Sequence, residues 1–143
     1  MITILIAIIV TVFDQLVKWL VQTEMDLGET IPVIPRIFHL TYIHNPGAAF
    51  GILPHQEWFF LAIVVILFAA FFVMRKKIPE KPFYFPSAVG MLLGGALGNA
   101  IDRVRYGSVV DFFDFRIWPI FNVADIFICV GVALIVFYFW RHN

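Results

Sequence analysis

Four long runs of apolar residues, separated by shorter polar stretches, dominate the pattern of this 143-residue chain. Each run approaches the roughly 20 residues that an α-helix needs to cross a hydrocarbon core about 30 Å thick. We therefore expect helices at residues 2–21, 58–74, 86–101 and 120–140. The pattern predicts an all-α integral membrane protein with four transmembrane helices, folded as a single domain over residues 1–143.

The segment 23–57, between the first two predicted helices, follows a different pattern. The two prolines of residues 30–35 disfavour a helix, and residues 38–43 alternate as in a half-buried strand. Residues 45–47 (Asn-Pro-Gly) mark a turn, and the apolar stretch 48–53 is too short to cross a membrane. We expect a small extracytoplasmic segment that is β-like at first and then lies in the membrane interface.

Composition supports the membrane class and gives the chain an orientation. Hydrophobic residues make up 62% of the chain and charged residues 14%, and the mean hydropathy is +0.91, far outside the range of soluble domains. The 10 basic and 10 acidic residues balance, so nothing indicates binding to nucleic acid. The densest basic cluster is residues 75–77, which the positive-inside rule places in the cytoplasm together with both termini.

The third predicted helix carries glycines at four-residue intervals, Gly90, Gly94 and Gly98. Such a small-xxx-small pattern allows another helix to approach closely. Asn99, Asp102 and Arg103 follow at spacings of three and four, which places all three on one side of the same helix as it reaches the outer surface.

Polar residues of three helices are expected at one depth in the membrane. At about 1.5 Å of rise per residue, Asp14 lies roughly 18 Å, Asn99 roughly 20 Å and Asp125 roughly 22 Å from the cytoplasmic helix ends. Lys18 lies one turn after Asp14, where it can neutralise that carboxylate and also reach toward the membrane surface. Charges within a span suggest a functional site, although a purely structural ion pair is equally open.

Asp111 and Asp125 lie in apolar surroundings, with no basic residue within four positions of either. Three other aspartates have basic neighbours, namely Asp14 with Lys18, Asp102 with Arg103 and Arg105, and Asp114 with Arg116. If Asp111 and Asp125 face each other, they should share a proton, as in an aspartic protease. The spacing alone is equally compatible with a simpler interpretation, in which one aspartate caps a helix and the other lies in a hydrated loop. Asp111 is expected in the loop before the fourth helix.

Other chemistries fit the sequence less well. Cys129 has no histidine in a plausible position, and a Ser108–Lys18 dyad is disfavoured because Lys18 already has Asp14 as a partner. No sequence motif indicates a metal ion, and no cofactor is expected. A small proton-coupled carrier would also place ionisable residues at this depth, but no internal repeat appears. A non-enzymatic assembly subunit would explain neither aspartate.

Five motifs in chain order resemble the signature blocks of the bacterial lipoprotein signal peptidases (signal peptidase II). They are Asp14-Gln15 with Lys18, Asn45-Pro46-Gly47-Ala48-Ala49-Phe50, Gly98-Asn99-Ala100-Ile101-Asp102-Arg103, Val109-Val110-Asp111-Phe112 and Phe121-Asn122-Val123-Ala124-Asp125. The resemblance implies a four-helix aspartyl endopeptidase of the bacterial inner membrane. Its substrates would be prolipoproteins, cleaved N-terminal to a cysteine that carries a diacylglyceryl group.

The resemblance also implies roles for individual residues. Asp111 and Asp125 would be the catalytic pair, with an active site toward the extracytoplasmic face. The polar residues around the pair would be Asp14, Lys18, Asn45, Asn99, Arg103 and Asn122. Lipid-modified prolipoproteins and membrane lipids are the expected partners, and the active unit is expected to be a monomer.

Overall fold

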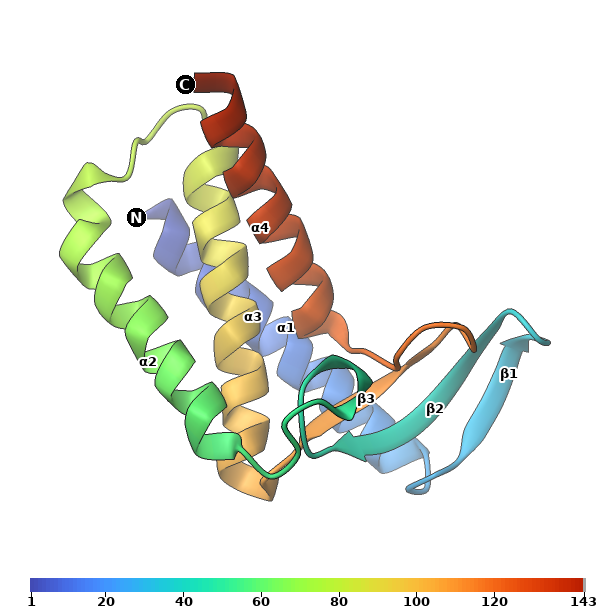
Figure 1. Cartoon of the computed structure of the whole chain (residues 1–143). Helices are drawn as coiled ribbons and strands as arrows, with labels where there is room; N and C mark the ends of the chain where they lie inside the picture. Colours follow the sequence, from blue (N-terminus) through green and yellow to red (C-terminus); the bar gives the residue numbers. More distant parts are fainter. Residues whose placement is uncertain (143) are drawn as a thin grey trace.

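The structure, a computed structural model that describes residues 1–142, combines a helical bundle with a small sheet at one end (Figure 1). The helices are α1 (Ile2–Glu24), α2 (Glu57–Met74), α3 (Tyr84–Tyr106) and α4 (Val123–His142). The strands β1 (Thr30–Ile34), β2 (Phe38–Asn45) and β3 (Val109–Asp114) form an antiparallel sheet in the order β1-β2-β3. Two short 3-10 turns, η1 (Ala49–Gly51) and η2 (Arg75–Lys77), complete the described elements.

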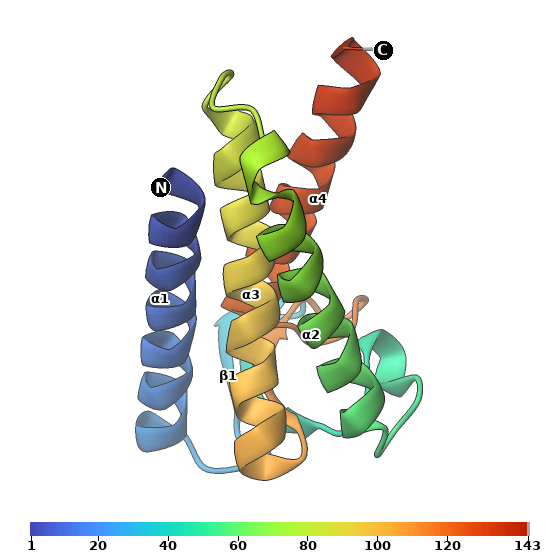
Figure 2. The same cartoon turned by 90° about the vertical axis from the view of Figure 1, so that its left-hand side faces the viewer.

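Helix α3 is the centre of the bundle and contacts each of the other helices (Figures 1 and 2). Its glycines allow this packing on two sides. A Cβ atom added at Gly94 would lie 2.6 Å from the carbonyl oxygen of Ala7 in α1, and one at Gly95 would lie 2.6 Å from that of Ala124 in α4. The close helix packing predicted from the glycine spacing is therefore confirmed.

Three helices, α1, α2 and α4, are long and apolar enough to cross a membrane, by length and composition. The expectation of four such helices is met only in part, because α3 does not reach that level of hydropathy. Glycines and the charged side chains of its last turns lower its apolar content. Most of α3 is covered by protein, whereas α2 contains no buried residue at all.

Helix α3 is longer than expected. It was predicted to end at residue 101 but continues to Tyr106, where Gly107 adopts a left-handed conformation with φ of 68°. The backbone N–H of Gly107 donates to the carbonyl oxygen of Arg103 over 2.9 Å and closes the last turn. The last turns of α3 therefore carry Asp102 and Arg103, although the apolar run that set the predicted boundary ends at residue 101.

Helix α4 begins later than expected, at Val123 rather than at residue 120. The side-chain oxygen of Asn122 accepts a hydrogen bond of 3.0 Å from the backbone N–H of Asp125, and the carboxylate of Asp125 accepts one of 3.0 Å from the N–H of Asn122. This reciprocal pair is a capping box, which satisfies two backbone donors that a helix start leaves free. The apolar pattern before Asn122 could not reveal this boundary.

Strand β3 was not expected, since Asp111 was assigned to a loop. Its residues are almost all buried, so the alternation that marks a half-exposed strand is absent. Val110 and Phe112, at 0% and 1% exposure, join a hydrophobic cluster with the end of α1, the middle of β2 and the start of α4. Burial of each side chain stabilises the fold by roughly 1.5–3 kcal/mol, which fixes the sheet against the bundle.

Candidate active site

Asp111 and Asp125 meet where the sheet joins the bundle, and Asn122 bridges them. The side-chain amide of Asn122 donates to Asp111 Oδ1 over 2.8 Å, and its backbone N–H donates to Asp125 Oδ2 over 3.0 Å. Asp111 is 2% exposed, and Asp125 is partly exposed in the first turn of α4. Both aspartates line a cavity of about 480 Å³. The structure therefore places the two carboxylates at one site.

Each carboxylate receives a second hydrogen bond from another asparagine. Asn99 on α3 donates to Asp125 Oδ1 over 2.9 Å, and Asn45 at the end of β2 donates to Asp111 Oδ2 over 3.2 Å. The pairing of Asn45 with Val109 across the strands brings its side chain to this position. All four donors are neutral amides. The pair is thus oriented without receiving a positive charge through a direct contact.

Next to this pair lies a buried ion-pair layer, which we define as Lys18, Asp14 and Asp102. Lys18 Nζ lies 2.8 Å from Asp14 Oδ2 and 2.8 Å from Asp102 Oδ2, and it donates to Asn99 Oδ1 over 3.0 Å. These three contacts use all the donors of an ammonium group. Lys18 is 1% exposed, so the expectation that it could reach the membrane surface is wrong.

The prediction that Asp102 pairs with its neighbours in the sequence is also wrong. Instead of Arg103 and Arg105, Asp102 contacts Lys18 and Gln15 of α1, with Gln15 Nε2 donating to Asp102 Oδ1 over 2.9 Å. Helical geometry explains the difference, because neighbours in sequence point in different directions around a helix. Asp102 and Gln15 both stand in the quoted motifs, but their contact was not predicted, because they are 87 positions apart in the sequence.

The ion-pair layer holds the backbone just before each aspartate of the site. Asp102 Oδ2 accepts a hydrogen bond of 3.1 Å from the N–H of Val110, and Asp14 Oδ1 accepts one of 2.8 Å from the N–H of Ala124. Val110 precedes Asp111 and Ala124 precedes Asp125 in the sequence. The layer therefore fixes the position of both carboxylates through the main chain.

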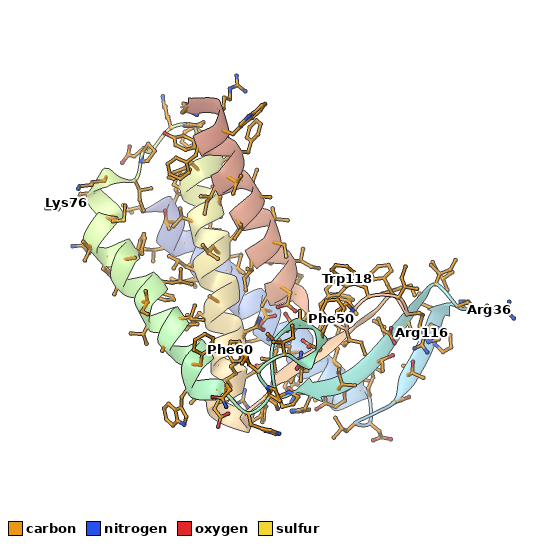
Figure 3. The ribbon with its side chains drawn as sticks, in the orientation of Figure 1. Arg36, Phe50, Phe60, Lys76, Arg116 and Trp118 are labelled. Carbon is orange, nitrogen blue, oxygen red and sulfur yellow. The ribbon has the colours of Figure 1, made fainter. Side chains whose placement is uncertain are left out.

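Arg103 faces the cavity from α3. Its guanidinium lies 4.4 Å above the ring of Phe60 on α2, and Nη2 is 3.5 Å from the carbonyl oxygen of Gly47. Among residues 1–142 it forms no ion pair. Figure 3 shows Phe60 near the end of α2 that adjoins the sheet. Arg103 is therefore available to bind a carbonyl or carboxylate that enters the cavity.

The cavity changes character along its length. The aspartates and asparagines form one end, whereas Ile126, Cys129 and Val130 of α4 continue it as an apolar surface. Phe50 and Trp118 approach each other at the sheet end of the bundle, with ring centroids 5.9 Å apart (Figure 3). This arrangement suits a ligand that has a polar centre and a long apolar part.

Burial raises the pKa of Asp111 to about 7, and the neighbouring carboxyl of Asp125 contributes in the same direction. Hydrogen bonds from Asn45 and Asn122 and the charge of Lys18 act in the opposite direction and are weaker in sum. A carboxyl with this pKa holds its proton at neutral pH about half of the time. The geometry thus supports two carboxylates that share one proton.

The serine–lysine alternative is not supported by the geometry. Ser108 Oγ lies 2.8 Å from His44 Nδ1, while Lys18 is fully occupied by the ion-pair layer. The expectation that one aspartate caps a helix and the other is hydrated is half right. Asp125 belongs to the capping box of α4, but Asp111 is buried in a strand.

Comparisons with known proteins identify the family. The model of the family described as "Signal peptidase (SPase) II" matches residues 6–141. A lipoprotein signal peptidase of Halothermothrix orenii is 45% identical over 139 residues, covering 97% of this chain and 95% of the relative. One of Pelotomaculum thermopropionicum is 53% identical over 133 residues, covering 92% and 86%.

A solved structure gives the same result. A bacterial membrane enzyme, solved by the in meso method at 2.3 Å resolution, superposes with a TM-score of 0.89 at 40% identity, covering 97% of this chain and 87% of that one. None of these comparisons supports a proton-coupled carrier. The chain belongs to the signal peptidase II family, as the order of its motifs had indicated.

Proposed function

We propose that this aspartic endopeptidase cleaves the signal peptide from diacylglyceryl-modified prolipoproteins, N-terminal to the modified cysteine, with Asp111 and Asp125 as its catalytic pair. The family match and the lipoprotein signal peptidases among its relatives support the substrate class. The observation that carries the residue assignment is the bridge of Asn122 between two carboxylates in one cavity.

In the mechanism that we propose, the two carboxylates have different protonation states. Asp125 accepts a hydrogen bond from the backbone N–H of Asn122 and lies beside the cavity, which suits a general base, whereas burial favours the protonated form of Asp111, whose pKa is about 7. Asp125 therefore acts as general base toward a water molecule. Asp111 donates its proton to the scissile carbonyl oxygen, and a proton later passes to the leaving amine. No covalent intermediate forms.

The remaining groups of the site position the substrate and the pair. Arg103, with no ion-pair partner among the described residues, binds a carbonyl oxygen of the substrate backbone. Asn45, Asn99 and Asn122 keep the carboxyl groups in a fixed orientation. Lys18 and Asp14 support the main chain beneath the pair.

The apolar part of the cavity accepts the acyl chains of the substrate. Ile126 and Val130 are both about 42% exposed on α4, which is apolar enough to cross a membrane. Each buried CH₂ group of an acyl chain contributes about 0.8 kcal/mol. A diacylglyceryl group would hold the substrate in the bilayer and set the scissile bond at the level of Asp111 and Asp125.

We propose that α3 is the fourth membrane-crossing helix and that the active unit is a monomer in the bacterial inner membrane. The other helices surround α3, so its glycines and charged side chains avoid most contact with lipid. The basic turn η2 and both termini lie at the end of the bundle away from the sheet (Figure 1). By the positive-inside rule that end is cytoplasmic, and the active site faces the extracytoplasmic side.

The proposal is tested by incubating the detergent-solubilised protein with one precursor in two forms, with and without diacylglyceryl on its cysteine. We expect cleavage of the lipid-modified form only. Equal cleavage of both forms would contradict the lipid-anchored mechanism. Cleavage of neither would contradict the peptidase assignment.

A further inference from the structure

A second cavity, of about 470 Å³, lies at the end of the bundle opposite to the catalytic pair. The first turn of α1, the end of α2 with η2, and the connection from η2 to α3 line it. Figure 2 shows α1 and α2 on either side of α3 at this end, and Figure 3 shows Lys76 far from Phe50 and Trp118. The cavity is therefore separate from the site described above.

One side of this cavity is basic. Arg75 and Lys76 line it, while Glu80 is its one acidic lining residue among residues 1–142. None of these three side chains forms an ion pair with another described residue. The Arg75 guanidinium lies 6.0 Å from the ring of Phe72, which is itself 53% exposed. With two basic side chains and one acidic side chain, the lining carries an excess of positive charge, which favours an anionic ligand.

The other side of the cavity is apolar and open to the membrane. Ile4, Phe71 and Phe83 line it, and Ile4 and Phe83 are 49% and 65% exposed. Helix α2 has no buried residue, so its surface near the cavity is free to contact lipid. Basic groups at a helix end next to apolar side chains match the two parts of a phospholipid, a phosphate and its acyl chains.

We propose that this cavity binds one anionic phospholipid of the leaflet that borders η2. The phosphate contacts Arg75 and Lys76, and the acyl chains lie against Ile4, Phe71 and Phe83. Glu80 would repel the phosphate, but its carboxylate can accept hydrogen bonds from the hydroxyl groups of a polyol headgroup. The bound lipid joins the start of α1 to the end of α2, two helices whose other contacts are made mainly with α3.

The test counts lipids that remain bound to the intact protein in native mass spectrometry, with phosphatidylglycerol and phosphatidylethanolamine titrated at equal concentrations. We expect one phosphatidylglycerol, bound roughly tenfold more tightly than phosphatidylethanolamine. The R75Q/K76Q variant should lose this preference. The matched K77Q/K81Q variant, which removes the same charge from the same segment but does not line the cavity, should keep it.

Three outcomes would overturn the proposal: equal binding of both lipids, an equal loss in R75Q/K76Q and K77Q/K81Q, or displacement of phosphatidylglycerol by millimolar glycerol phosphate. The last result would identify a site for free phosphate instead of a lipid. Cleavage of lipid-modified precursor in lipid-free detergent reports whether each variant is folded.

A second variant keeps the test possible if R75Q/K76Q does not fold. Ile4→Trp fills the apolar side of the cavity without changing its charge, and it should exclude the lipid. Retention of phosphatidylglycerol by Ile4→Trp would contradict the proposal.

Discussion

The protein buries two neighbouring groups of carboxylates and treats their charges in different ways. Asp14 and Asp102 share the ammonium of Lys18 at 2.8 Å each, whereas Asp111 and Asp125 receive hydrogen bonds from neutral amides only. The carboxylates of the first group share a buried cation and hold structure. An uncompensated pair can release and accept a proton, which hydrolysis requires. This difference is why we assign a supporting role to the first group and propose the catalytic role for the second.

The largest expected effect follows from removing a proton-transfer group of the uncompensated pair. Asp111→Asn should lower cleavage of lipid-modified precursor by roughly 10³-fold or more, because an amide cannot donate a proton as a carboxylic acid does. Thermal unfolding should change little, since no cation loses its partner. Ser108→Ala is the control and should retain activity. Substantial turnover by Asp111→Asn would exclude this residue from catalysis.

Changing the ion-pair layer should lower the stability of the protein, in contrast to the loss of activity expected for Asp111→Asn. Lys18→Met leaves Asp14 and Asp102 buried without a cation, and breaking such a pair costs roughly 3–5 kcal/mol of the free energy of unfolding. Thermal unfolding in detergent measures this loss. Adding Asp14→Asn to Lys18→Met should recover part of it, because one buried charge is then removed. If Lys18→Met were as stable as the unchanged protein, the ion-pair layer would not support the fold.

The pH dependence of cleavage tests the shared proton. Since the pKa of Asp111 in the folded protein, about 7, lies above its ordinary value of 3.8, the protonated form is present below pH 7 and is lost as the pH rises. We expect kcat/KM for lipid-modified precursor to fall about tenfold per pH unit above that value. Asn45→Ala removes a hydrogen bond that lowers this pKa, so the decline should move to higher pH. A profile that stays flat to pH 9 would argue against a protonated Asp111.

The smallest effect on cleavage and stability is expected for substitution of Asp114, an aspartate that pairs with an arginine near solvent. Asp114 lies three residues after Asp111 in β3 and pairs at 2.7 Å with Arg116, whose side chain is 44% exposed. Asp114 itself is 5% exposed, but Arg116 is near solvent, so the charge of the pair contributes at most about 1 kcal/mol. An asparagine at this position can still accept the hydrogen bonds from Thr41 and from the backbone N–H of Arg116. Asp114→Asn should therefore leave cleavage within about twofold and barely change thermal unfolding. A loss of activity comparable to that of Asp111→Asn would show that the position in β3, rather than compensation by a cation, decides the role.

Sequence patterns predicted the parts of this arrangement that depend on neighbours along the chain. The Asp14–Lys18 pair lies one helical turn apart, and the glycine spacing of α3 reports its packing. The motifs also identified the family, and they named eight candidate site residues. Six of them lie at the cavity or between its two aspartates, and the other two, Asp14 and Lys18, belong to the ion-pair layer. The role of each residue in catalysis stays a prediction until the variants above are measured.

The missed features depend on contacts between distant segments. Asp102 finds Lys18 across two helices, and its nearer arginines gave the wrong answer. Strand β3 is buried along nearly all of its length and so lacks the alternating pattern of a surface strand. Helix α3 is crossed on several sides by other helices, so its hydropathy does not reveal how it relates to the membrane. In each case tertiary packing overrides the local signal.

The anchoring of Val110 and Ala124 by Asp102 and Asp14 has a consequence for biogenesis. The two anchoring carboxylates lie on α1 and α3, which precede α4 and its aspartate in the chain. Until α4 docks, no nascent form contains both aspartates in a common cavity. If Asp111 and Asp125 are the catalytic pair that we propose, proteolytic competence requires that α4 has packed against α1 and α3.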